Sequence, residues 1–153
     1  MKVYRVLILF FVSLAFLFSW SVVSNVEAAS IWPTASATLC WQASYDGVPL
    51  GIIRLRSVSM GGVYYLLSGK ISTNDGKSYI GHGTAQVNAT RILITVNGSG
   101  KSAEDMETGT AHVILSASTL NGSWETMGQD FNYIDESTDM EHETGKLTKI
   151  PCP

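Results

Sequence analysis

The side chains that could do chemistry are few and lie far apart in the sequence. The three histidines are His82, His112 and His142. Metal sites assembled from separated strands have no diagnostic spacing, and isolated histidines in a small domain are more often surface or hydrogen-bonded residues. No Ser-His-acid grouping can be assembled from sequence positions alone. We therefore expect no catalytic residue, no metal ligand and no cofactor, which means a protein that is not an enzyme.

The densest run of charge lies near the C-terminus. It holds Asp135, Glu136, Asp139, Glu141 and Glu143. Their spacing does not fit an EF-hand loop, and no glycine stands where that loop turns sharply, so only a weak calcium contact could be built from them. Runs of charge usually face water. The sequence therefore predicts that the segment from Gly128 to Glu143 is the longest connection in the chain. It is either a recognition loop, because apolar residues lie among the acids, or a flexible solvated loop.

One glycine-rich segment resembles a phosphate-binding loop. It reads Gly98-Ser99-Gly100-Lys101-Ser102, but Thr95 stands where the first glycine of that pattern belongs. No helical pattern follows to place a phosphate at a helix N-terminus. We expect a hairpin turn here.

The two cysteines are the residues with the clearest chemical consequence. Cys40 follows an apparent export signal, and Cys152 is the second-last residue. Disulfides form and persist in oxidising compartments, and two cysteines leave only one pairing. The sequence predicts a Cys40–Cys152 disulfide that ties the two ends of one domain together.

The export signal occupies the first residues. Lys2 and Arg5 precede an apolar run, Val6 to Phe18, and a more polar stretch then ends in small residues at Ala28. This order is typical of a signal peptide. We expect a signal peptide at residues 1–28, a single domain at residues 29–153, and a secreted or periplasmic protein with no stable membrane span after cleavage. An uncleaved membrane anchor is the alternative.

The charge of the chain argues against one class of partner. The formal net charge is −3, and the ten Lys and Arg residues are scattered. Nucleic-acid binding requires clustered basic residues. We expect no nucleic-acid partner, and a monomer.

The elements of the mature chain are strands, because apolar residues recur with period two between Gly, Asn, Asp and Ser breaks. Eight strands are predicted: Thr38–Tyr45, Gly51–Met60, Val63–Ser72, Ser78–Asn88, Thr90–Val96, Thr110–Ser118, Leu120–Gln129 and Thr144–Pro151. No helical period extends over three turns. The candidate inward residues are Leu39, Trp41, Ile53, Leu55, Tyr65, Leu67, Ile92, Ile94, Val113, Leu115, Leu120 and Trp124.

Eight short strands with tight connections favour an all-β fold, an antiparallel up-and-down barrel. A disulfide between the first and last strands needs Cα atoms within about 7 Å, and closure of a barrel supplies that distance. A two-sheet β-sandwich is the alternative, because it could also bring the ends together.

This layout resembles the calycin group, which includes the lipocalins and avidins, over nearly the whole mature chain. The resemblance is one of architecture. The first strand reads Thr38-Leu39-Cys40-Trp41-Gln42, without the Gly-x-Trp of those families, and Gly122-Ser123-Trp124 occurs on the seventh strand instead. The resemblance implies a small exported barrel that holds a ligand.

The fourth strand bears on whether the interior is hollow. Gly81, Gly83 and Ala85 share one face, and His82 lies on the other with Thr84 and Gln86. Inward small residues would leave space, whereas an inward polar face would need water or a ligand. Paired glycines at alternate positions also mark a bend or the close approach of another backbone.

Two functions remain as hypotheses. The first is a binding module for a small apolar or amphipathic ligand, with Trp41, Tyr65, His82 and Trp124 as the candidate binding residues. The second is a protein-binding barrel, such as an inhibitor of a protease or other hydrolase, or a structural envelope protein without a ligand. A cavity of about 300 Å³ or more would favour the first, and a filled interior with an exposed apolar loop the second.

Overall fold

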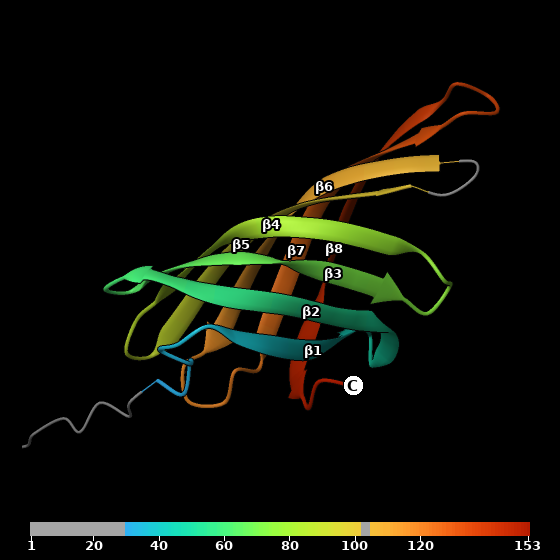
Figure 1. Ribbon diagram of the computed structural model, residues 1–153. Helices are drawn as coiled ribbons and strands as arrows, with labels where there is room; N and C mark the ends of the chain where they lie inside the picture. Colours follow the sequence, from blue (N-terminus) through green and yellow to red (C-terminus); the bar gives the residue numbers. More distant parts are fainter. Residues whose placement is uncertain (1–29, 102–104) are drawn as a thin grey trace, which may run out of the picture.

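The computed structural model describes residues 30–101 and 105–153. The predicted signal peptide, residues 1–28, lies outside the described residues. The described chain is all-β and forms a closed barrel of eight antiparallel strands in up-and-down order, as the period-two pattern predicts (Figure 1). In this part of the chain no helix has the length and apolarity needed to cross a membrane.

Each strand pairs with its neighbours in sequence, and the first pairs with the last, so the sheet has no free edge. The strands are β1 (Ala37–Tyr45), β2 (Val48–Gly61), β3 (Tyr64–Thr73), β4 (Ser78–Val87), β5 (Arg91–Lys101), β6 (Asp105–Ser116), β7 (Gly122–Asn132) and β8 (Thr138–Ile150). The β1–β2 hairpin shows how local sequence sets this register. Asp46 and Gly47 both have positive φ, 47° and 82°, and that conformation matches the twist of two-residue hairpins.

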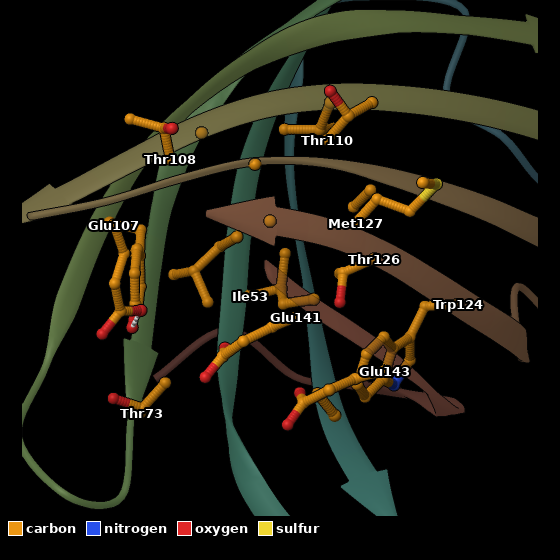
Figure 2. A pocket seen from close by; sticks show the side chains of 18 of the residues that line it. Ile53, Thr73, Glu107, Thr108, Thr110, Trp124, Thr126, Met127, Glu141 and Glu143 are labelled. Atoms are coloured by element: carbon orange, nitrogen blue, oxygen red, sulfur yellow. Dashed lines mark hydrogen bonds between the residues drawn. The ribbon is translucent and has the colours of Figure 1, made fainter. Parts of the chain in front are cut away.

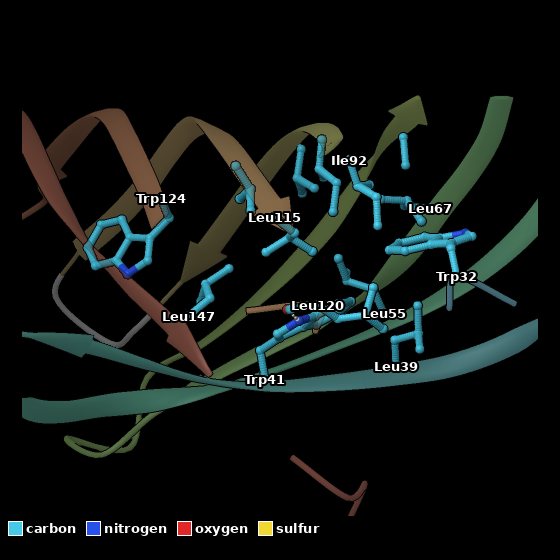
Figure 3. Close-up of a cluster of buried hydrophobic side chains, with 14 of the residues drawn as sticks. Trp32, Leu39, Trp41, Leu55, Leu67, Ile92, Leu115, Leu120, Trp124 and Leu147 are labelled. Carbon is cyan, nitrogen blue, oxygen red and sulfur yellow. Dashed lines mark hydrogen bonds between the residues drawn. The ribbon is translucent and has the colours of Figure 1, made fainter. Parts of the chain in front are cut away.

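The barrel has two different ends. Strands β1, β3, β5 and β7 finish at one end of the barrel, which we call the mouth, and strands β2, β4, β6 and β8 finish at the other, which we call the closed end (Figure 1). Most of the buried apolar side chains fill the closed end (Figure 3). They include Leu39, Trp41, Leu55, Tyr65, Leu67, Ile92, Ile94, Val113, Leu115 and Leu120.

Trp32, which precedes β1, completes the seal at the closed end. Only 4 % of its surface is exposed, and its ring stacks on Trp41 with centroids 6.3 Å apart and meets Tyr65 edge-on. The N–H of Ile31 donates to the carbonyl oxygen of Ala117 between β6 and β7. The chain therefore covers this end of the barrel before its first strand begins. The Trp41 Nε1 group donates to the carbonyl oxygen of Leu120, 2.8 Å away.

The predicted disulfide is present. Cys40 and Cys152 are bonded, with Cα atoms 5.1 Å apart. The bond lies beside the β1–β8 seam, whose pairing runs only from Cys40 to Ser44 on β1 and is the shortest of the eight. The disulfide thus reinforces the place where the sheet closes on itself.

The register of β4 settles which of its faces is inward. Gly81, Gly83 and Ala85 face the interior, and His82 faces outward and is exposed. A Cβ on Gly83 would stand 2.0 Å from the carbonyl oxygen of Thr95 on β5, so this glycine permits a close approach of two backbones.

Two local predictions at the mouth are wrong. Gly98 and Gly100 do not form a hairpin turn, because β5 continues through them to Lys101. The segment from Gly128 to Glu143 is not one long loop. It belongs mostly to β7 and β8, and only residues 133–137 connect them. The predicted strands are too short at this end. Apolar alternation stops there, because glycine or acidic residues occupy the inward positions.

Candidate functional site

The mouth half of the barrel is hollow. A cavity of about 230 Å³ opens there, enclosed by inward-facing residues of several strands (Figure 2). It is smaller than the roughly 300 Å³ that is common for ligand pockets. A narrow void of about 30 Å³ lies among Trp41, Ile53 and Leu55 and their neighbours. The interior is therefore packed at one end and open at the other.

The cavity exists because inward positions at this level carry little or no side chain. The small lining residues are Ala43, Gly51, Gly98, Gly109, Ala111 and Gly128. An eight-stranded barrel has just enough interior for side chains to fill it, so omitting several leaves a space for a small ligand. Gly98 shows this clearly. A Cβ added there would meet only the carbonyl oxygen of Ile80, at 3.5 Å.

Apolar side chains line the inner part of the cavity. Ile53, Ile71, Val96, Val113 and Trp124 contribute to it. The indole of Trp124 projects from β7 into the interior (Figure 3), and Gly145 on β8 leaves room for it, since a Cβ there would lie 2.6 Å from the ring. The Trp124 Nε1 atom is buried and has no hydrogen-bond partner. The wall thus holds one enclosed donor without an acceptor.

Carboxylates line one side of the mouth. The registers of β6, β7 and β8 place six of them on the inward face, and we call them the rim acids: Asp105, Glu107, Asp130, Asp139, Glu141 and Glu143. Glu107 is paired directly with Asp130, Asp130 with Asp139, and Gly128 with Glu141. Glu107, Glu141 and Glu143 line the cavity itself (Figure 2).

Glu107 accepts hydrogen bonds from two side chains. The Lys77 Nζ atom, from the turn between β3 and β4, donates to Glu107 Oε1 and forms an ion pair with it, and the Tyr79 hydroxyl donates to Glu107 Oε2. The hydrogen bond to Glu107 raises the pKa of Lys77. Burial, and then the bond to Glu107, raise the pKa of Tyr79. Both groups therefore keep their protons at neutral pH.

The other rim acids disfavour one another's charge. Loss of solvation, followed by the carboxylates of Asp105 and Glu107, raises the pKa of Asp130. Loss of solvation, followed by Glu107 and Glu143, raises the pKa of Glu141. Like charges held close together destabilise the ionised forms. The mouth is therefore a region of unbalanced negative potential.

The structure separates the four residues predicted to bind a ligand. Trp124 lines the cavity. Trp41 and Tyr65 belong to the packed closed end, and the side chain of His82 faces the outer surface of the barrel. His112 and His142 also face outward, bonded to Thr95 and to Glu125 respectively. Among the described residues, no three His, Cys, Asp or Glu side chains are grouped so that they could hold a metal ion.

Sequence reasoning missed the rim acids and Trp32. The period-two spacing of Asp139, Glu141 and Glu143 is a strand signal, but acidic residues on an inward face contradict the usual pattern of an apolar interior. An aromatic residue followed by proline just before the first strand was the available sign of a sealing segment.

Comparison with protein-family models, with curated proteins and with solved structures finds no match for this chain. The closed barrel is consistent with a calycin-like architecture, and that statement rests on the strand topology alone.

Proposed function

We propose that the protein is a binding barrel that holds a small amphipathic molecule in the cavity at its mouth. The observation that carries the proposal is the two-part interior, packed at the closed end and hollow at the mouth. An engineered protein cavity of about 150 Å³ binds benzene. By that measure the cavity of about 230 Å³ accommodates an apolar body of roughly ten heavy atoms, with a polar group at the rim.

The proposal includes export. The disulfide suggests a location outside the cytoplasm, and the charged and apolar order of the first residues supports secretion or a periplasmic location. The protein is then a lipocalin-like carrier in its use of the barrel, without catalytic activity of its own.

A second candidate is the protein-binding barrel. It is favoured by exposed apolar side chains at the tip of the mouth, where Ile134 and Met140 are each 73 % exposed. Exposed apolar groups of this kind can mark a docking site. The hollow interior has no role in this candidate, which is why we place it second.

The direct test is binding of a neutral probe of suitable size, phenethyl alcohol, followed by ligand-observed NMR and calorimetry. Gly98→Leu should abolish binding, because the new side chain extends into the cavity. Ser99→Leu is the matched control. It adds the same side chain to the next residue of β5, which is exposed on the outer face.

Loss of binding in Gly98→Leu alone supports the proposal. Equal binding to both variants would place the probe on the outer surface and refute it. Absence of binding to the unaltered protein would refute it as well.

A further inference from the structure

We propose that the molecule held in the cavity is a small organic amine, with its ammonium group among the rim acids and its apolar body against Trp124. This inference rests on the proposed function, since it concerns the chemical class of the ligand in the same cavity. It adds that the ligand carries a positive charge, which the shape of the cavity alone does not require.

The first support is the imbalance of charge at the mouth. Three neighbouring strands direct six carboxylates inward. Lys77 forms an ion pair with Glu107, and Lys101 lies over the ring of Tyr133 and beside Asp105 and Glu107, so the carboxylates outnumber these cations. Glu141 and Glu143 line the cavity, and neither forms a hydrogen bond or ion pair within residues 30–101 and 105–153. Both side chains are exposed at the mouth, and like charges held close together disfavour the ionised forms. A bound cation would offset the repulsion from Glu107 and Glu143, which adds to loss of solvation in raising the pKa of Glu141.

The second support is the way in which the mouth already binds an ammonium group. Lys77 Nζ lies against Glu107, whose other oxygen accepts the Tyr79 hydroxyl. The rim therefore accommodates a primary amine through a charge-assisted hydrogen bond, the stronger class of such bonds. Glu141 and Glu143 line the same cavity as Glu107 and offer further carboxylate acceptors, and no amine of the described residues is bonded to them.

The third support is Trp124, which is independent of the acids. Only 7 % of its surface is exposed, it lines the cavity, and its Nε1 donor has no acceptor. Its ring forms an aromatic wall against which the apolar body of the amine packs.

A metal ion fits the rim less well than an amine. Calcium takes six to eight oxygen ligands in one shell, whereas among the described residues no three acidic side chains are grouped so that they could hold a metal ion. A single ammonium needs only one or two of them. The geometry therefore favours an organic cation with an apolar part.

The test compares three probes of nearly the same size: phenethylamine, phenethyl alcohol and phenylacetate. Affinities are measured by calorimetry at pH 7 in low salt. The amine should bind at least about tenfold more tightly than the alcohol, as expected for a charge-assisted hydrogen bond, and phenylacetate should bind most weakly. The preference for the amine should shrink in 1 M salt, where the Debye length falls to about 3 Å.

Two variants locate the effect. Glu141→Gln should reduce the preference for the amine severalfold and leave binding of the alcohol unchanged. Glu125→Gln is the control, because it removes one carboxylate from β7 on the outer face, where Glu125 is bonded to His142. Its preference for the amine should match that of the unaltered protein.

The possible failures are distinguishable. If the alcohol binds in a manner sensitive to Gly98→Leu and the amine binds no more tightly, the ligand class is wrong and the binding cavity stands. If none of the probes binds, both proposals fail. Displacement of the amine by stoichiometric Ca²⁺ would show that the rim is a metal site and would overturn the inference.

Discussion

Removal of the Cys40–Cys152 bond should destabilise the barrel more than any single side-chain contact. The bond closes a loop with a sequence separation of 112. In the chain-entropy treatment a loop of this length contributes about 4.8 kcal/mol at 25 °C. Unfolding a domain of roughly 125 residues has an entropy of about 0.26 kcal/mol/K, so the same loss lowers the Tm by about 18 °C.

The double variant Cys40→Ala/Cys152→Ala is measured by guanidinium and thermal denaturation beside the oxidised protein. Cys40 is fully buried, so the variant also loses packing. The reduced protein keeps the same side chains and isolates the effect of the bond, and the difference between it and the variant gives the packing loss.

The location of the loss is part of the prediction. Because the β1–β8 seam is the shortest pairing in the barrel, amide hydrogen exchange in the reduced protein should accelerate first at Trp41 and Ala43. The β4–β5 pair, which runs from Tyr79 to Val87 on β4, should remain protected longer. A loss below about 1.5 kcal/mol, or uniform acceleration in all strands, would refute the argument that the bond holds the sheet closed.

Three further predictions concern the two ends of the barrel. Trp32→Ala should cost about 3–5 kcal/mol, the usual cost of truncating a buried aromatic residue, whereas Ile31→Ala, at a half-exposed position, should cost less than about 0.5 kcal/mol in the same denaturation assay. Gly98→Leu should leave the free energy of unfolding unchanged or raise it by up to about 1 kcal/mol. The backbone at position 98 is not left-handed, and glycine has the larger conformational entropy in the unfolded chain. A clear loss of stability would mean that the cavity has no space beside position 98. The pKa of Glu141 is raised above 4.5 in the folded chain, so the folded chain binds more protons at this carboxyl than the unfolded chain does. The contribution of Glu141 to stability therefore becomes unfavourable as the pH rises above about 4.5. Glu141→Gln should therefore be more stable than the unaltered protein at pH 7, with a gap in Tm that closes as the pH falls below 4.5; a constant gap would contradict the repulsion.

The closed end could be predicted from the sequence because its inward positions carry apolar side chains, the usual pattern for the interior of a barrel. Ile53 and Leu55 alternate with Arg54 and Arg56, and such alternation identifies the inward face of a strand directly. The two cysteines then indicated closure, and the structure agrees. The packing of this end depends on the burial of apolar side chains, and apolar residues can be identified directly in the sequence.

The mouth could not be predicted in the same way. There the strands continue through inward Gly98, Glu107 and Glu141, and neither glycine nor glutamate signals an interior position. These segments are strands because their backbones pair with neighbours that are already in register. The residues that make the cavity are therefore those that a search for apolar alternation treats as turns and loops.

The closed end also determines how the barrel can be held. The segment before β1 is bonded to the connection after β6, where the N–H of Ile31 donates to Ala117. The segment after β8 lies beside the first strand, where Cys152 is bonded to Cys40 (Figure 1). Both points lie opposite the mouth. A surface, a resin or a fused protein joined at either point would meet the sealed end of the barrel, and the cavity with its acidic rim would face the surrounding solution.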